Sequence, residues 1–399
     1  MKISEIKEKL KIGYINPVLE EIFASPDFDA KDVSFLSEEY MREKSRKYSV
    51  LGEREDDGIK KALKIKDDEA ALTFFNLAKA YLDKVDGDIE KSLGLCMPDG
   101  YGENDSLDML PMAVLFTQLD KAKERYIALG MSENDAMMHM EAFGKSFEKA
   151  STLMQRTGLN RMYFNWLCIY LGAGLITVSG FNFEMKKYNL SGVFLKNKTT
   201  GKLLAVIKDA KIHSSGLILG TAGCENEEGS YFADLTETDT EYIGYPVNEK
   251  GLCEKEKQVL KKMEWEKVLS PGDYAVSFHI PKGADLSHSN LDKVFSEGIE
   301  KIKSYYSDKS VRCVICGSWL LSPQFEGMLK EGSNIVAFGK RFARLPFRNG
   351  GKDVFSFVFP PGIEKYEDLP ENTSLERALK KLYMEGNFLY SFYGAFEIR

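Results

Sequence analysis

Cysteine and histidine are scarce in this chain, and neither is grouped as a metal site would require. Six cysteines and four histidines occur among 399 residues. Cys313 and Cys316 form one C-x-x-C pair, typical of a redox pair or of half a zinc site, but no second pair or nearby histidine pair completes a ligand set. The run 311–316 is apolar, which favours two cysteines packed inside a buried strand. We therefore expect no bound metal.

The cysteines are also too scattered for a disulfide framework in a chain of this length. Residues 1–5 are charged and contain no apolar core of a signal peptide. Both observations favour a reducing compartment, and the expected location is the cytoplasm.

An excess of positive charge is missing as well. The chain has 54 lysines and arginines against 61 aspartates and glutamates, and its net charge is −7. Such a chain does not attract DNA or RNA as a whole, so no nucleic-acid partner is expected. An anionic ligand such as a coenzyme needs a local cluster of donors.

One long uncharged run, residues 162–183, has the length of a membrane span. It contains Asn165, Thr177 and Asn182, and Gly172 and Gly174 interrupt it. A buried helix that ends at these glycines and is followed by a strand explains the run better. We therefore expect no membrane partner.

Residues 1–170 are predicted to form a helical domain. Asn16 and Pro17 are typical of a cap and a first helical turn, and residues 67–85 and 110–129 place apolar side chains at helical spacing. Ser132 with Asp135 resembles a capping box that begins a further helix.

Residues 171–399 show a different pattern. Residues 176–188 alternate like a strand, and 192–195 with 202–208 predict a hairpin around the turn 197–201. The polar, acidic stretch 224–257 is interpreted as a surface excursion that can serve as a substrate-facing flap.

A strand–helix–strand unit follows. Its expected parts are a strand at 273–280, a helix capped by Ser287 or Ser289, and a central strand at 311–321. We also expect a helix at 323–329, strands at 334–338 and 353–359, a helix from Thr373 to Gly386, and a closing strand at 388–398. The prediction is an α+β or α/β fold, with a mixed sheet flanked by helices after the helical domain.

Five stretches resemble a known protein family. They are WEKVLSPGD at 265–273, HIPKG at 279–283, SWLLSP at 318–323, SNI at 333–335 with Phe338, and LP at 369–370 with TSL at 373–375 and Arg377. They resemble bacterial acyltransferase-domain proteins with a helical N-acyltransferase-like N-terminal domain and a GNAT-like C-terminal domain. The resemblance covers residues 160–399, and the domains it implies are 1–170 and 171–399.

The resemblance implies a two-domain acyltransferase that uses acyl-CoA, with two departures. The family typically has a histidine between the second cysteine and the Ser-Trp pair, where this chain has Gly317. GNAT enzymes usually bind pyrophosphate with a Gln/Arg-x-x-Gly-x-Gly/Ala turn, whereas residues 281–286 here read PKGADL.

Direct acyl transfer from a thioester to an amine needs a base and a group that protonates the thiolate. His279 is the first candidate base because its ordinary pKa suits neutral pH, and Glu184 is the second. Ser318 is a candidate hydrogen-bond donor to the thioester carbonyl, or a candidate nucleophile. Tyr393 is a candidate proton donor to the departing thiolate. Structural interpretations are a strand-end lock for His279, a solvated strand carboxylate for Glu184 and aromatic packing for Tyr393.

The candidate coenzyme site is the junction that follows His279. Lys282 and Gly283 lie in it, and Ser287, Ser289 and Asn290 lie where the next helix begins, so that helical N–H groups and a lysine can hold a pyrophosphate. Two hypotheses remain. The chain is an acyltransferase that uses acyl-CoA and a small-molecule acceptor, or a degenerate GNAT fold that binds a ligand or partner without turnover.

Overall fold

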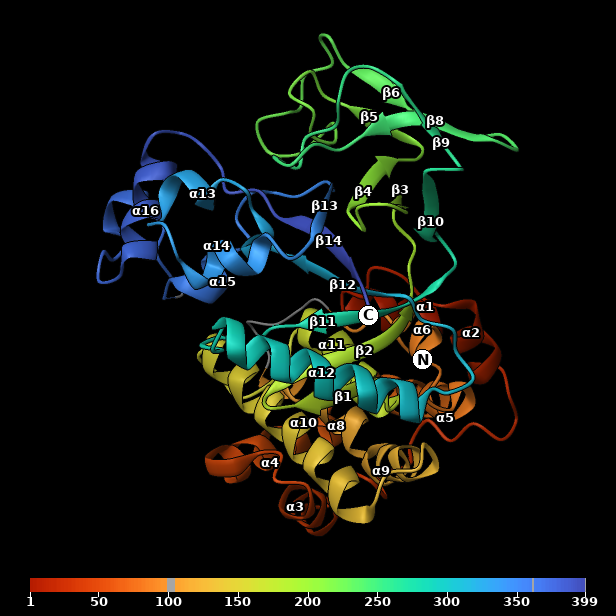
Figure 1. The fold of residues 1–399 in the computed structure, drawn as a ribbon. Helices are drawn as coiled ribbons and strands as arrows, with labels where there is room; N and C mark the ends of the chain where they lie inside the picture. Colours follow the sequence, from red (N-terminus) through yellow and green to blue (C-terminus); the bar gives the residue numbers. More distant parts are fainter. Residues whose placement is uncertain (99–104, 361, 399) are drawn as a thin grey trace. The chain divides into compact units, whose positions relative to one another are not determined.

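The computed structural model describes residues 1–98, 105–360 and 362–398. The chain divides into two compact units, residues 1–176 and 177–399, and Figure 1 shows the fold of each. No helix in the described ranges combines the length and the apolar character needed to cross a bilayer.

The first unit is helical, as predicted. Asn16 caps α2 through its side chain, Ser132 caps α10 by accepting from the Asp135 N–H, and Gly172 follows α11. Its helices are α1 (Ile3–Lys9), α2 (Pro17–Phe23), α3 (Glu38–Lys47), η1 (Gly52–Arg54), α4 (Glu55–Leu63), η2 (Lys64–Asp67), α5 (Glu69–Val85), α6 (Ile89–Ser92), α7 (Asp105–Asp108), α8 (Leu110–Phe116), α9 (Leu119–Ala128), α10 (Glu133–Leu153) and α11 (Arg161–Leu171).

Two helices form the centre of this unit. Every residue of α8 is buried, and α5 buries most of its residues between Ala70 and Leu82. A helix that buries residues on every side must be enclosed by other helices. Helix α5 packs against α1, α2 and α8. The predicted helix 110–129 is in fact two, because the chain breaks at Thr117 and Gln118 between α8 and α9.

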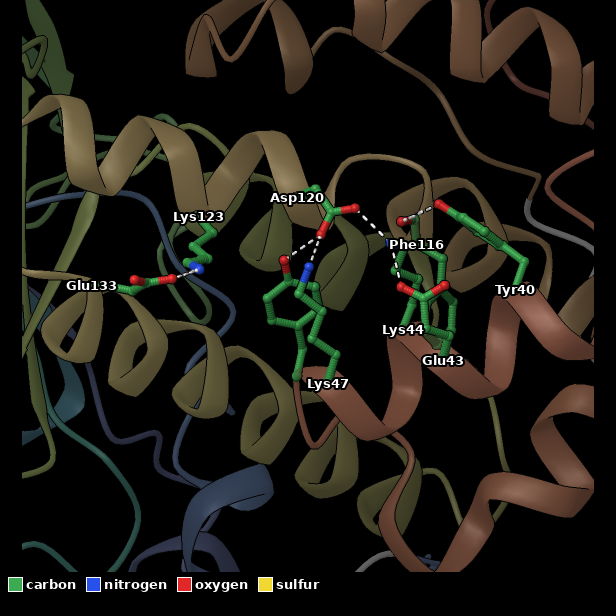
Figure 2. Close-up of polar contacts among 9 residues, drawn as sticks. Tyr40, Glu43, Lys44, Lys47, Phe116, Asp120, Lys123 and Glu133 are labelled. Atoms are coloured by element: carbon green, nitrogen blue, oxygen red, sulfur yellow. Dashed lines mark hydrogen bonds and ion pairs between the residues drawn. The ribbon is translucent and has the colours of Figure 1, made fainter.

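A partly buried polar cluster joins α3 to α9 in this unit (Figure 2). Asp120 accepts hydrogen bonds from Lys44 at 2.6 Å, from Lys47 at 2.8 Å and from the Tyr48 hydroxyl at 2.5 Å. Burial raises the pKa of the Asp120 carboxyl, but these three hydrogen bonds outweigh burial and hold the pKa far below its usual value. The cluster therefore favours an ionised Asp120.

The described residues of the second unit form three sheets. A six-stranded sheet has the order β1 (Leu175–Val178), which spans the unit boundary, β2 (Phe181–Lys187), β11 (Tyr274–His279), β12 (Cys313–Ser318), β14 (Phe392–Glu397) and β13 (Ala343–Pro346). A second sheet has the order β10 (Trp265–Leu269), β3 (Gly192–Asn197), β4 (Leu203–Ile207), β8 (Glu241–Pro246) and β7 (Leu235–Glu237), with β9 (Gln258–Lys261) also paired to β8. The third pairs β5 (Ala210–Ile212) with β6 (Tyr231–Ala233).

Helix α12 (His288–Tyr305) lies along one face of the six-stranded sheet (Figure 1). Phe295 of α12 packs on Phe278 at a ring-centroid distance of 4.5 Å and on Phe396 at 5.0 Å. A Cβ at Gly298 would lie 2.2 Å from the Phe183 ring, so glycine allows the helix to approach the sheet. Because side chains alternate along a strand, the neighbours of Phe183 and Phe278 point to the other face.

Part of that other face packs against the second sheet. Ala275, Ile315 and Ala395 of the six-stranded sheet share one buried cluster with Phe194 and Ala205 of the second sheet. Much of the stretch 224–257 is exposed, as expected of the predicted surface excursion, but the stretch also contributes strands to two sheets. It forms β6, β7 and β8, in which alternate residues of β8 are buried.

The remaining helices of the second unit correct two further predictions. Residues 334–338 and 353–359 were expected to be strands, but they contain the short helices α14 and α15. Short apolar runs do not distinguish a strand from one helical turn. The helices are η3 (Trp319–Leu321), α13 (Phe325–Met328), α14 (Asn334–Gly339), α15 (Phe355–Val358), η4 (Tyr366–Asp368) and α16 (Ser374–Met384), the last with a capping box of Thr373 and Glu376.

We expect Asp120→Asn to lower the free energy of unfolding at pH 7 by about 1–2 kcal/mol, a range reduced for solvent screening because the side chain is 44% exposed. A carboxyl group whose pKa is lower in the folded state than in the unfolded state stabilises the fold at pH values above its unfolded-state pKa. The stability advantage of the wild type over Asp120→Asn should therefore be full above about pH 5 and shrink as the pH falls. Urea unfolding from pH 3 to pH 8 measures this. Glu133→Gln, which removes an exposed partner of Lys123, is the control, and a pH-independent difference for Asp120→Asn would contradict the expectation.

Candidate functional site

The candidate site lies where two parallel strands separate. Strands β11 and β12 pair at only two positions, Val276 with Val314 and Ser277 with Ile315. Beyond them β11 continues to His279 along β2, and β12 continues to Ser318 along β14. The last residues of the two strands therefore diverge, each held by a different outer neighbour.

Glu184 and His279 form a hydrogen-bonded pair on β2 and β11. The His279 Nε2 and Glu184 Oε2 atoms are 2.9 Å apart, although 95 residues separate them in the sequence. The Glu184 side chain is 6% exposed and that of His279 is 29% exposed. The structure thus unites the two residues that the sequence proposed as alternative bases.

The charge of Glu184 follows from its surroundings. Burial raises the pKa of the Glu184 carboxyl, but the hydrogen bond with His279 and the charge of Lys186 outweigh burial, so the pKa is lower than usual. An ionised carboxylate is an acceptor, and His279 Nε2 therefore donates the hydrogen bond. In the neutral ring, Nδ1 then carries the lone pair that can accept a proton.

Tyr393 lies on the same sheet face as this pair. On β14 it is paired with Gly317 of β12, and its ring packs against Phe347 at 4.9 Å between centroids. A Cβ at Gly317 would meet the Tyr393 ring at 2.7 Å. The Tyr393 ring thus occupies the space into which a side chain at position 317 would point.

Ser318 does not join these residues. It follows Gly317 on β12, and the alternation of side chains places it on the opposite face, which is the face of α12. Its hydroxyl oxygen accepts a hydrogen bond of 3.1 Å from the Leu320 N–H and so caps η3. This arrangement is structural and gives Ser318 no contact with His279.

The junction between β11 and α12 contains the predicted coenzyme-binding residues. Lys282 and Gly283 are exposed at a turn, and Gly283 has φ +79°, a left-handed conformation that glycine adopts without strain. Ser289 is exposed in the first turn of α12, and Asn290 donates to the Asp285 carbonyl oxygen at 2.8 Å. The structure places all of these residues in one continuous surface segment.

Of the two predicted capping residues, Ser287 and Ser289, the structure places Ser287 at the N-cap of α12, but neither side chain makes a described capping hydrogen bond. Ser287 is the residue before the helix, but its hydroxyl and its N–H both donate to the Asp285 carboxylate, at 2.9 and 2.8 Å. No described group accepts from the first three N–H groups of the helix, those of His288, Ser289 and Asn290. These groups have the orientation that suits a phosphate oxygen.

Arg341 is a residue near this turn that the sequence analysis missed. It follows α14, and its guanidinium bonds Asp292 at 2.7 Å and contacts the His288 ring. The partners lie about 50 residues apart and share no motif, so only the packing of α14 beside α12 reveals them. Arg341 brings a second cation, after Lys282, to the start of α12.

The cysteines show no sign of reactive thiols. Cys313 and Cys316 are buried in β12, as predicted, and burial raises the pKa of each thiol to about 12. Within the described ranges, no group of three or more histidine, cysteine, aspartate or glutamate side chains is arranged to hold a metal ion.

A separate cavity of about 1480 Å³ lies in the second unit. It is bounded by α12, β4, residues 340–344 and the end of β14, and neither Glu184 nor His279 lines it. The hydrogen-bonded pair and the cavity are therefore two distinct features of this unit.

Comparison with known families identifies the second unit. The model of the family described as GNAT-like C-terminal domain matches residues 185–396. The chain belongs to this family. The match contains β11, α12 and β12, and it confirms the resemblance read from the motifs. No curated protein matches the chain.

Several solved structures have the same fold over the whole chain. An acyltransferase in complex with decanoyl-CoA and teicoplanin is similar to this GNAT-like chain with a TM-score of 0.67 and 14% identity, and 100% of each chain is covered. Acyltransferase complexes with decanoyl-CoA, at 15% identity, and with CoA and 10C-teicoplanin, at 14%, match with a TM-score of 0.64 and the same coverage. At these identities the likeness establishes the fold.

We expect Gly317→Ala to lower the free energy of unfolding by about 1–3 kcal/mol, because the added methyl group would collide with the Tyr393 ring. Without that collision, alanine in a strand would stabilise by about 0.5–1 kcal/mol. A double-mutant cycle with Tyr393→Ala, measured by urea unfolding, checks the cause. An equal loss in the Tyr393→Ala background would show that the ring is not responsible.

Proposed function

We propose that this GNAT-like chain transfers an acyl group from an acyl-CoA thioester to the amine of a small-molecule acceptor. The observation that carries the proposal is the Glu184–His279 pair, which lies where β11 and β12 diverge. A partly exposed histidine held by a buried carboxylate is well suited to act as a general base at neutral pH. The fold shared with acyltransferases in complex with acyl-CoA supports the choice of donor.

In the proposed step, the acceptor ammonium first loses a proton to His279 Nδ1. The neutral amine then attacks the thioester carbonyl carbon, the C–N bond forms and the C–S bond breaks. Coenzyme A leaves as a thiolate, and Tyr393, on the same sheet face, is the proposed proton donor to it. The tyrosinate that results takes the second proton, which the acylated nitrogen must lose to become an amide. Glu184 acts through His279, because its charge stabilises the imidazolium that forms. Ser318 has no part in this step.

The proposed coenzyme site is the junction after His279. The pyrophosphate would accept from the open N–H groups at the start of α12, with Ser289 and Asn290 in that turn. Lys282 would supply a positive charge, and Gly283 would allow the backbone to approach closely. Arg341 would supply a second charge. The carboxylate of Asp285, beside Ser287, opposes an anion here, so the two cations are needed for binding.

The same proposal covers the organisation of the chain. Residues 1–170 would be an N-acyltransferase-like helical domain, and residues 171–399 the acyltransferase domain of a bacterial, cytoplasmic enzyme without a nucleic-acid partner. Free, buried cysteines support a reducing compartment. The alternative is a degenerate GNAT fold that binds a ligand or partner without turnover, and the glycine at position 317 favours it.

Coenzyme A should raise the melting temperature of the full chain, because a ligand that binds only the folded state stabilises it. Lys282→Ala should reduce the shift, and added salt should weaken it. Lys293→Ala, on an exposed position of α12, is the control and should leave the shift unchanged. Differential scanning fluorimetry measures these shifts, and none at millimolar coenzyme A would favour the non-catalytic alternative.

His279→Gln should lower the acyl-transfer rate by about 100-fold or more, because glutamine keeps a donor for Glu184 but cannot accept the proton. The free energy of unfolding should change little for the same reason. Thiol release from decanoyl-CoA in the presence of an amine, with urea unfolding of the same preparation, separates the two effects. An unchanged rate per folded molecule would remove His279 from the mechanism.

A further inference from the structure

Ser277 of β11 is a buried serine on the same sheet face as the Glu184–His279 pair. It pairs with Glu184 of β2 in the antiparallel register, and paired residues point to the same face. Residues two apart on a strand also share a face, so His279 follows Ser277 on this face, about 7 Å farther along β11. The three polar residues thus form one group on two adjacent strands.

Ser277 also marks the point where β11 and β12 separate. It pairs with Ile315 at the last of the two positions that the strands share. The preceding residue on this face, Ala275, belongs with Ile315 to the buried cluster between the two sheets. Beyond Ser277 the strands diverge toward His279 and Gly317. Ser277 therefore lies at the boundary between a hydrophobic cluster and the space between the strand ends.

The protein itself offers the Ser277 hydroxyl no partner among the residues that the structure describes, although the residue is only 5% exposed. The carboxylate of Glu184 accepts instead from His279 at 2.9 Å and from Lys186 at 3.5 Å. The main chain of β11 pairs here with a strand on each side, so its carbonyl groups are used in the sheet. A nearly buried hydroxyl without a partner is costly, which favours a role toward a ligand.

The position of Ser277 suits the carbonyl oxygen of a thioester. During the attack, the amine nitrogen lies beside His279 and about 3 Å from the carbonyl carbon. With a hydrogen bond of about 2.8 Å at each end, side chains about 7 Å apart along β11 can hold the nitrogen and the carbonyl oxygen. The adjoining hydrophobic cluster limits access of water, which strengthens a hydrogen bond to a developing negative charge.

We infer that Ser277 donates a hydrogen bond to the thioester carbonyl oxygen and stabilises the oxyanion that forms during acyl transfer. The inference rests on the proposed function. When the amine attacks, one electron pair of the C=O bond moves to the oxygen, and the Ser277 O–H stabilises this charge without giving up its proton. When the C–S bond breaks, the pair returns to the C=O bond and coenzyme A leaves as the thiolate.

The first test is the variant Ser277→Ala. Its rate of acyl transfer from decanoyl-CoA to an amine should fall about 100-fold, the scale for the loss of one oxyanion donor. The KM for decanoyl-CoA should change little, because the lost bond is stronger in the transition state than in the bound substrate. The urea midpoint should stay the same or rise, because no described hydrogen bond is lost. An unchanged rate per folded molecule would overturn the inference.

Ser318→Ala is the matched control. Ser318 lies on the neighbouring strand but on the opposite face, where its side chain caps η3. Loss of this cap should lower the urea midpoint and leave the rate per folded molecule unchanged. An equal fall in the rates of Ser318→Ala and Ser277→Ala would show a general disturbance of the strand ends and would contradict a specific role of Ser277.

The pH profile of the rate separates contact with the substrate from support of the Glu184–His279 pair. A hydroxyl that donates to the carbonyl oxygen does not titrate at these pH values, so Ser277→Ala should lower the rate by the same factor at every pH. If Ser277 acted through the pair, the profile of Ser277→Ala would shift along the pH axis. Such a shift would overturn the inference.

Infrared difference spectroscopy of decanoyl-CoA, isotopically labelled at the thioester carbonyl carbon, tests the contact without turnover. A hydrogen bond lowers the stretching frequency of a carbonyl group, so the band of the bound thioester should lie at higher frequency in Ser277→Ala than in the wild type. An identical band in both proteins would overturn the inference and leave an active transferase in place. A shifted band in a protein that transfers no acyl group would support the contact and contradict the proposed function.

Discussion

The brief parallel pairing of β11 with β12 determines where each candidate catalytic residue lies. Because the two strands share only two positions, each completes its hydrogen bonds with an outer neighbour, β2 for β11 and β14 for β12. The pairing with β2 brings Glu184 beside His279, and the pairing with β14 brings Tyr393 over Gly317. A longer pairing would place the ends of β11 and β12 side by side and leave no space between them for a substrate.

The two faces of this sheet serve different purposes. The face toward α12 is filled by phenylalanine rings, and these rings hold the helix whose first turn presents open N–H groups. The opposite face carries the polar pair. A rigid aromatic layer therefore supports both proposed functional elements, and the cavity beside α12 uses the edge of the same layer.

Local patterns predicted much of this fold, whereas the arrangement of the site depends on tertiary structure. The helices of residues 1–170, the strand–helix–strand unit and helix α16 follow from periodicity and capping residues. The apolar runs in α14 and α15 were mistaken for strands because they are too short to show a period. The Glu184–His279 hydrogen bond depends on the register in which two strands pair across 95 residues of sequence. The sheet face to which Ser318 points likewise depends on the register of β12 with β14.

The close approach of Tyr393 to Gly317 also constrains how this sequence can change over evolutionary time. Any side chain introduced at position 317 meets the ring, and loss of the ring alone removes a packing partner of Phe347. Single substitutions at either position therefore pass through a less stable protein, and paired substitutions avoid it. Relatives with a histidine at the position of Gly317 should accordingly carry a smaller residue at the position of Tyr393, so the two columns of an alignment would vary together.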